Sequence, residues 1–443
     1  MYRSIPQSPT RRSSPPLLAA FVFASALPLS AQRGPTDPPP PPRVDEPAAP
    51  LLQLGEFALL DLSLDTLFSV GSSTANDAEL EFLQAGGHDP RQRGFNLQNV
   101  ELGLRGRVDD WLGAEAYLVL GIDPIDGETT VELEEAFVKT IGLGSGFEVE
   151  VGHMSTEFGL HNPLHPHDWQ FLDAPVILAR LFGPDGLRAP GARVGWRPPL
   201  PWSTTLHLGV QNARGETMAS FLANDELYAE RPVGGRAFTD RRVRNLGDLV
   251  WLLRLEQSWR AGRAGSIQFG ASALFGPNAT GEDAATRIYG ADLAVRWTDD
   301  HGCGHGHGHG HGLTWTTEVL RREFDAAAFT SGSTLVPGSE LVDQGAYTQL
   351  VYDFDSPWSV GLRYEHTIGS GDSWDGERLV SHDLDPLRDR RSRITPMLAW
   401  RASESTRLRL QYAYDDARHL DEAAHTVWLG IEVSLGSHPV HGP

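Results

Sequence analysis

Apolar and polar residues alternate along most of the chain beyond Leu54. In FALLDLSLD, Ala58, Leu60, Leu62 and Leu64 fall on one face and polar residues fall on the other. Such a period of two is typical of a β-strand with two different faces. The segments GAEAYLVLGI, STRLRLQYAY and TVWLGIEVSL repeat the pattern. They reach about ten residues, which is long for a globular strand and suitable for a tilted strand that crosses a membrane.

About sixteen segments of this kind can be counted. They fall near 54–71, 95–108, 111–122, 129–141, 146–154, 190–197, 202–211, 247–260, 265–275, 287–298, 313–324, 345–354, 357–367, 391–402, 404–414 and 424–435. An even number allows an antiparallel sheet to close with both of its ends on one side. The pattern therefore predicts an all-β fold, a transmembrane antiparallel β-barrel of about 16 strands over 54–435.

The connections between these segments alternate in length. VDD, GLGS, PPLP and RAGRAG are short, whereas 72–94, 155–189, 212–246 and 368–390 are long. Membrane barrels have short periplasmic turns and long external loops, so the rhythm supports the same architecture. Tryptophans cluster at the short-turn ends of the strands, as an aromatic girdle would. They are Trp111, Trp196, Trp202, Trp259, Trp297, Trp315, Trp358 and Trp400. Packing sites in a soluble β-core are the alternative explanation for them.

The first 53 residues predict export and a linker. Arg3, Arg11 and Arg12 precede the apolar run PLLAAFVFASALPLSA, which we interpret as a signal peptide over 1–31. A proline-rich linker follows over 32–53, and residues 436–443 form a tail after the last strand. We therefore expect the protein in the bacterial cell outer membrane, in contact with outer-membrane lipid.

Composition narrows the function. A net charge of −21 argues against nucleic-acid binding, because such a surface repels phosphates. A single cysteine allows no internal disulfide. The chain contains no HExxH, GxSxG or Walker phosphate loop, so we predict no enzyme, although residues of a barrel active site need no local motif.

Three stretches carry a family resemblance. They are GGHDPRQRGFNLQNVELGL (86–104), FEVEVGHMSTEFGLHNPLHPHDWQFLDAP (147–175) and FGPDGLRAPGARVGW (182–196). They resemble bacterial outer-membrane barrels of the phosphate-selective porin type, and most of all a porin-like subgroup described as zinc-regulated. The resemblance implies a diffusion channel whose third external loop, here 155–189, folds inward and narrows the pore. We assign His161, His165, His167 and Asp168 to that constriction. His165 and His167 offer two imidazoles to a metal, but Pro163 and Pro166 indicate a rigid loop and Trp169 indicates packing, and this structural interpretation is favoured.

The polar face of the strands carries charges of both signs. It includes Arg254, Arg363, Arg393, Arg407 and Arg409, together with several glutamates. The arginines either form a basic wall for anions or pair with carboxylates across strands, and pairing is slightly favoured. Because this face is expected to be wet, replacing Arg409 by Leu should cost less than placing Arg at the lipid-facing Leu410.

The run HGCGHGHGHGHG, residues 301–312, joins the tenth and eleventh segments. It supplies His301, Cys303, His305, His307, His309 and His311 as candidate metal ligands. Alternating glycine gives the run no fold of its own, so we predict weak binding of zinc or nickel and no required cofactor. A low-complexity expansion with incidental metal affinity is the alternative. By strand parity the run lies at the periplasmic mouth.

These observations predict a porin-like channel for passive diffusion of small hydrophilic solutes or ions, with a link to divalent-metal (zinc) handling left open. A barrel that binds metal or ligands, or a barrel enzyme without channel activity, is the alternative. A homotrimer is an assembly that the sequence allows.

Overall fold

The computed structural model of the 443-residue chain describes residues 51–54, 57–122, 127–262, 264–299 and 311–436. These residues belong to one compact unit, Ala49–Pro443. The predicted signal peptide and nearly all of the predicted linker and tail lie outside the described residues, so those predictions stay as they were.

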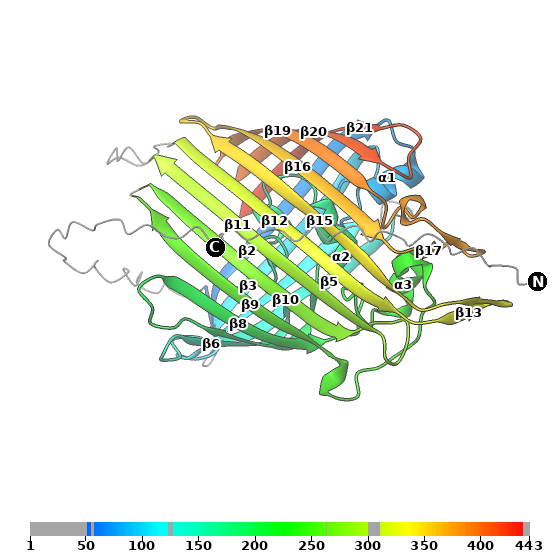
Figure 1. Cartoon of the computed structure of the whole chain (residues 1–443). Helices are drawn as coiled ribbons and strands as arrows, with labels where there is room; N and C mark the ends of the chain where they lie inside the picture. Colours follow the sequence, from blue (N-terminus) through cyan, green and yellow to red (C-terminus); the bar gives the residue numbers. More distant parts are fainter. Residues whose placement is uncertain (1–50, 55–56, 123–126, 263, 300–310, 437–443) are drawn as a thin grey trace, which may run out of the picture. The chain divides into compact units, whose positions relative to one another are not determined.

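Sixteen long strands form one closed antiparallel sheet (Figure 1). They are β2 (Phe57–Ser73), β3 (Gly94–Arg107), β4 (Leu112–Ile122), β5 (Thr129–Thr140), β6 (Phe147–Ser155), β7 (Arg188–Trp196), β8 (Ser203–Asn212), β9 (Leu249–Ala261), β10 (Gly265–Pro277), β11 (Ala285–Asp299), β12 (His311–Ala326), β15 (Ser339–Asp353), β16 (Trp358–Ser370), β19 (Arg391–Ser403), β20 (Thr406–Ala417) and β21 (Ala424–Leu435). Each pairs with the next along the chain, and β21 pairs back with β2, from Leu64↔Leu435 to Ser73↔Thr426. The predicted 16-strand barrel is confirmed.

Short elements lie in the connections and, in the case of β1, before the first long strand, with which it pairs. They are β1 (Leu52–Leu54), the hairpins β13 (Phe329–Ser331)–β14 (Thr334–Val336) and β17 (Ser373–Trp374)–β18 (Leu379–Val380), α1 (Asp77–Leu83), α2 (Val176–Phe182), α3 (Asp225–Glu230), and the single 3₁₀ turns η1 (Pro166–Asp168), η2 (Val233–Gly235), η3 (Leu246–Asp248) and η4 (His382–Leu384). The sequence analysis missed them because segments of two to seven residues are too short to show a period. Among the described residues no helix combines the length and apolarity needed to cross a membrane.

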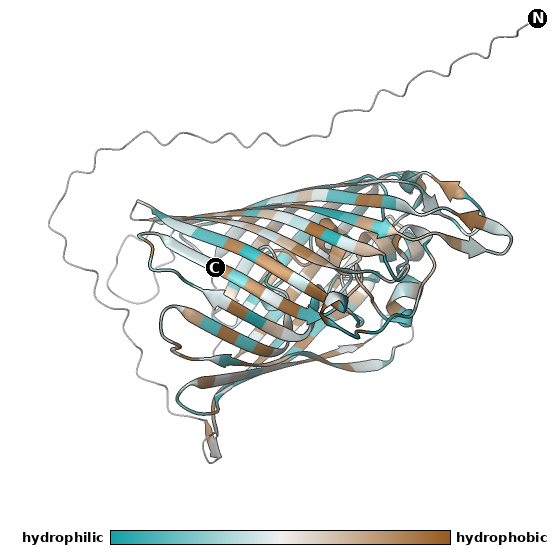
Figure 2. Cartoon of the chain, turned by 60° about the horizontal axis from the view of Figure 1, so that its bottom comes forward, coloured by the Kyte–Doolittle hydropathy of each residue, from teal (hydrophilic) through white to brown (hydrophobic). Residues whose placement is uncertain are grey.

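Hydrophobic and hydrophilic residues alternate along the strands (Figure 2). The exposed fractions of the side chains place large apolar residues on the outer face. Leu253, Leu362 and Leu410 are about half exposed, whereas the neighbouring Arg254, Arg363 and Arg409 are buried on the inner side. All eight tryptophans of the expected girdle are at least 36% exposed. Trp358 and Trp400 face each other in register and stack at 6.0 Å between ring centroids. We call the rim that carries the short connections, such as 108–111 and 262–264, the short-connection edge; all eight tryptophans lie close to it.

The inner face differs from the wet lumen that the sequence predicts. In the half of the barrel nearest the long loops, residues of α2 belong to an apolar cluster with inward side chains of six strands, β7, β9, β10, β11, β12 and β15. The cluster comprises Phe158, Ile177, Leu178, Leu181, Phe182, Leu187, Ala189, Ala213, Met218, Phe221, Leu222, Val250, Leu252, Leu274, Ile288, Leu320 and Tyr347. We call it the apolar plug. Full burial of one large apolar side chain contributes about 1.5–3 kcal/mol, so the plug stabilises the inward position of α2.

Candidate functional site

The connection from β6 to β7, Thr156–Leu187, runs through the barrel interior, and we call it the inner loop. Its backbone is bound by inward side chains of strands far apart in the sequence. The N–H groups of His161, Leu172 and Val176 donate to carboxylate or amide oxygens of Glu318 (2.8 Å), Gln411 (2.9 Å) and Glu365 (2.6 Å). These acceptors lie on β12, β20 and β16, so the loop contacts the barrel wall on several sides.

His165 of the inner loop contacts a group of carboxylates on β3 and β5. Its Nδ1 lies 3.2 Å from Glu101 Oε2 and 3.4 Å from Glu134 Oε2, and its Nε2 lies 3.1 Å from Glu135 Oε2. Glu134 and Glu135 are neighbours in one strand, yet both are buried inside. A register shift between β4 and β5 turns both of them inward, as a β-bulge does. Burial alone would lower the pKa of His165, but Glu101 and Glu134 raise it well above its usual value.

His167 lies two residues further along the chain and faces Glu101 together with Asp65. Its Nδ1 lies 3.6 Å from Glu101 Oε1 and 3.8 Å from Asp65 Oδ2. Its Nε2 lies 3.6 Å from Asp168 Oδ2. Burial opposes protonation of His167, and Glu101 outweighs it, so the pKa of His167 is raised.

His161 has aromatic neighbours in place of carboxylates around its ring. Its ring sits 4.9 Å from Trp169 and 6.3 Å from Tyr347, measured between centroids. Burial and the nearby Arg363 lower the pKa of His161 to about 3. The close contacts of His165, His167 and Asp168 therefore form one group, whereas the ring neighbours of His161 are Trp169 and Tyr347.

The five arginines assigned to the lumen all point inward, and each is paired. Arg254 binds Asp292 (2.6 Å), Arg363 binds Asp173 (2.5 Å), Arg393 binds Asp173 (2.7 Å) and Asp415 (2.8 Å), and Arg407 and Arg409 bind Glu432 (2.8 and 2.5 Å). Arg409 also donates to the inner-loop carbonyls of Trp169 and Phe171. Of the two interpretations of these arginines, the geometry favours charge pairing over an open basic wall.

A cavity of about 630 Å³ lies between the inner loop and the short-connection edge. Its lining includes eight carboxylates and six basic side chains. They are Glu115, Glu135, Glu148, Glu150, Glu157, Asp168, Asp173 and Glu256, and Lys139, Arg193, Arg197, Arg254, Arg296 and Arg363. Charges of both signs suit polar solutes without a strong preference for anions. Sequence reasoning named only three of these residues as site residues, since cavity lining depends on strand register.

The histidine run is described only at its end. His301, Cys303, His305, His307 and His309 lie outside the described residues. His311 belongs to β12, opposite Asp299 of β11, and its Nδ1 lies 3.0 Å from the Tyr352 hydroxyl. Both strands end at the short-connection edge, whereas metal binding by the run stays a prediction.

Comparison with known proteins identifies the fold. No family model matches the chain. An uncharacterized protein of Aquifex aeolicus is 28% identical over 406 residues, which cover 86% of this chain and 80% of that protein. Similar solved structures include the outer membrane channel DcaP of Acinetobacter baumannii (TM-score 0.54, 11% identity, 87% of this chain and 100% of that one). They also include an anion-selective porin from Comamonas acidovorans (0.51, 13%, 86% and 100%) and OprB of Pseudomonas putida (0.51, 11%, 86% and 94%).

The chain has the fold of the outer-membrane porins. The finer resemblance to phosphate-selective or zinc-regulated barrels draws no support from these comparisons, and it stays an expectation from the sequence.

Proposed function

We propose that this protein is a porin-like channel of the bacterial outer membrane for passive diffusion of small hydrophilic solutes or ions. The observation that carries the proposal is the closed 16-strand barrel with a charged cavity of about 630 Å³ in its interior. In a closed barrel every strand has a hydrogen-bonded neighbour on each side, so no backbone group at a sheet edge lacks a partner in lipid. The outer face can therefore contact lipid while the inner face binds polar groups. A structural neighbour, the outer membrane protein OmpT of Vibrio cholerae, is known in a trimer form, and a homotrimer is part of the proposal.

The inner loop is the proposed constriction. Around its level the inward residues are buried on the apolar plug side (Leu252, Ile288), on the arginine side (Arg363, Arg409) and on the β3 side (Glu101). Solvent therefore barely reaches these walls at the level of the inner loop. This covering of the walls supports the inner loop as the part that narrows the passage.

Single-channel conductance in planar bilayers tests the proposal. Deletion of residues 160–170 from the purified mature protein should raise the conductance, because it removes the middle of the constriction. Deletion of 330–335, the tip of the β13–β14 hairpin, is the matched control and should leave the conductance unchanged. A folded barrel that gives no conductance with or without residues 160–170 would refute the channel.

The alternatives predict different results. A barrel that only binds ligands, or a barrel enzyme, gives no conductance in either form. An anion-selective pore, as one neighbour is named, would show a reversal potential shifted toward anions in a salt gradient. The mixed lining of the cavity favours weak selectivity. A link to zinc handling would require conductance that changes with added Zn²⁺.

A further inference from the structure

Two carboxylates face each other directly across adjacent strands inside the barrel. Asp65 of β2 is the register partner of Glu101 of β3. Asp65 is 1% exposed and Glu101 is fully buried. Like charges directly opposite one another destabilise a sheet, and burial raises the cost because little water screens them. The pair therefore favours a positive charge between its members.

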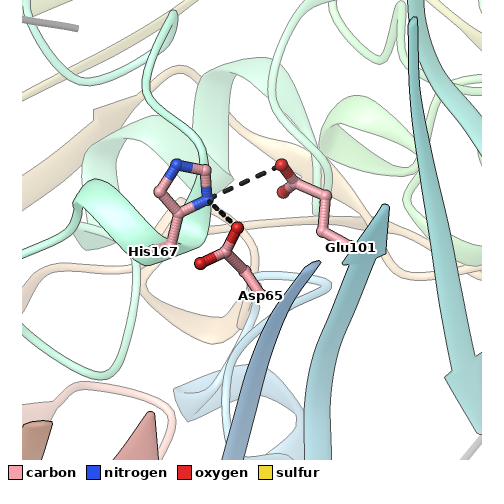
Figure 3. A group of neighbouring side chains, drawn as sticks. All are labelled: Asp65, Glu101 and His167. Carbon is pink, nitrogen blue, oxygen red and sulfur yellow. Dashed lines mark ion pairs between the residues drawn. The ribbon is translucent and has the colours of Figure 1, made fainter. Parts of the chain in front are cut away.

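His167 of the inner loop is directed at this pair (Figure 3). Its Nδ1 lies 3.6 Å from Glu101 Oε1 and 3.8 Å from Asp65 Oδ2. Both distances exceed hydrogen-bond length. Within the described residues, Glu101 Oε1 accepts no hydrogen bond, although it is buried. The three donor atoms lie within 4.8 Å of one another, so they converge without touching.

These distances suit a shared cation. Zinc-like ions hold imidazole nitrogen and carboxylate oxygen at about 2.0–2.2 Å, which places tetrahedral ligands roughly 3.4 Å apart. The two separations from His167 Nδ1, 3.6 and 3.8 Å, need only a few tenths of an ångström of adjustment, and the two carboxylate oxygens lie within 4.8 Å of each other.

The neighbouring groups fix the orientation of two of these side chains. The second oxygen of Glu101, Oε2, lies 3.2 Å from His165 Nδ1. The second nitrogen of His167, Nε2, faces Asp168 Oδ2 at 3.6 Å. Histidines that bind metals commonly direct their other nitrogen to a carboxylate, which fixes the tautomer and the ring plane. Pro166, in the turn η1 between the two histidines, restricts the backbone.

We propose that Asp65, Glu101 and His167 bind one divalent transition-metal cation inside the barrel. One imidazole with two carboxylates suits Zn²⁺, Co²⁺, Mn²⁺ or Fe²⁺, whereas Ca²⁺ and Mg²⁺ prefer oxygen ligands alone. The site uses no residue of the histidine run at 301–312. Because His167 belongs to the inner loop and the two acids belong to the barrel wall, a bound cation ties the loop to β2 and β3. Metal binding does not depend on the proposed channel activity and is measured without it.

The histidine run would obscure this site in any binding measurement. The test therefore uses the full-length mature chain with residues 301–310 replaced by a glycine-serine segment of equal length. The protein is purified in detergent, stripped with a chelator and titrated with Co²⁺, whose visible spectrum reports the ligand field. We expect one Co²⁺ per chain, displaced by Zn²⁺. Asp65→Asn, Glu101→Gln and His167→Gln should each weaken binding at least about tenfold.

Matched controls remove similar groups elsewhere in the interior. Glu115→Gln removes an inward carboxylate that pairs with Lys139, and His207→Gln removes an inward imidazole on β8 that contacts Arg193. Both should bind Co²⁺ with unchanged affinity. Heat-modifiable migration on gels verifies that each variant is a folded barrel. Absence of stoichiometric binding, or equal affinity in all five variants, would overturn the proposal and leave an ion pair between His167 and the acids.

A second measurement covers the case in which the site variants fail to fold. X-ray absorption of the Zn²⁺-loaded protein that lacks the run should show a mixed nitrogen and oxygen shell with a single imidazole. Two or more imidazoles, or a shell of oxygen alone, would contradict this ligand set.

Discussion

Side chains one residue apart in this barrel occupy different environments, and β20 shows it most clearly. Leu410 is 47% exposed on the outer face, whereas Arg409 is 1% exposed inside. The face assignment made from the sequence is therefore correct, but the reason given for a mild Arg409 substitution is wrong. Arg409 does not face water, since it binds Glu432 and two carbonyls of the inner loop.

We accordingly expect both residues to be sensitive, for different reasons. Leu410→Arg places a charge in hydrocarbon and should cost about 2–4 kcal/mol. Arg409→Leu leaves Glu432 with Arg407 alone and should cost about 3–5 kcal/mol at most, the range for breaking a buried ion pair. Urea unfolding in lipid vesicles measures both free energies. Arg401→Ala, at an exposed position, is the control and should change stability by less than about 0.5 kcal/mol.

His161 gives a pH dependence with a defined sign. Burial and Arg363 lower the pKa of His161 to about 3, and Asp173, Glu318, Tyr347 and Trp169 complete its surroundings. In the unfolded chain its imidazole titrates near 6.5. The folded state therefore binds fewer protons, so its stability is full above pH 6.5 and falls as the pH drops toward 3.

The size of this effect can be isolated by substitution. Between pH 7 and pH 5 the loss attributable to His161 is about 2 kcal/mol. His165 and His167, whose pKa values are raised, act in the opposite direction, so the test compares the wild-type protein with His161→Gln at each pH. The variant should lose less stability on acidification. Parallel curves for the two proteins would show that His161 does not titrate in this way.

At the scale of elements, the two-residue alternation of apolar and polar positions determined which strands could be predicted. All sixteen barrel strands were anticipated, because each is nine or more residues long and most show the two-residue alternation. The contents of the barrel were not anticipated. Met218, Phe221 and Leu222 lie in a connection with no strand or helix pattern, yet they fill the interior against α2. The candidate site divides in the same way: His165 and His167 are visible in the loop sequence, whereas their partners Asp65 and Glu134 depend on register and on a bulge.

The apolar plug makes a prediction at this scale. Phe182 of α2 is fully buried and packs edge-on against Phe158 at 5.3 Å between centroids. Phe182→Ala should destabilise the protein by about 3–5 kcal/mol, because it removes an aromatic ring from a packed interior. It should also raise the conductance, since the plug holds the inner loop in place. Leu384→Ala, at a residue that is 64% exposed in η4, is the control for both measurements.

At the scale of the whole molecule, the rim at which a connection lies follows from the closed antiparallel sheet and from whether the connection is odd or even in number along the chain. Sixteen antiparallel strands place every odd-numbered barrel connection at one rim and every even-numbered one at the other. The exposed Asp110 lies in the connection from β3 to β4, and the exposed Glu377 lies between β17 and β18. These two residues belong to opposite rims, and residues 300–310 join the strands β11 and β12 at the rim of Asp110.

Labelling of single thiols in intact cells tests this arrangement and the proposed orientation together. Cys303 is the only cysteine, so Asp110→Cys and Glu377→Cys are each made in a Cys303→Ser background. A maleimide reagent too large for the pore should label Glu377→Cys from outside, because long loops face outward in membrane barrels. It should label Asp110→Cys and the native Cys303 only after the outer membrane is permeabilised. Labelling of Cys303 in intact cells while Asp110→Cys stays protected would contradict the parity of the strands, whereas labelling of both, with Glu377→Cys protected, would reverse the orientation and leave the barrel intact.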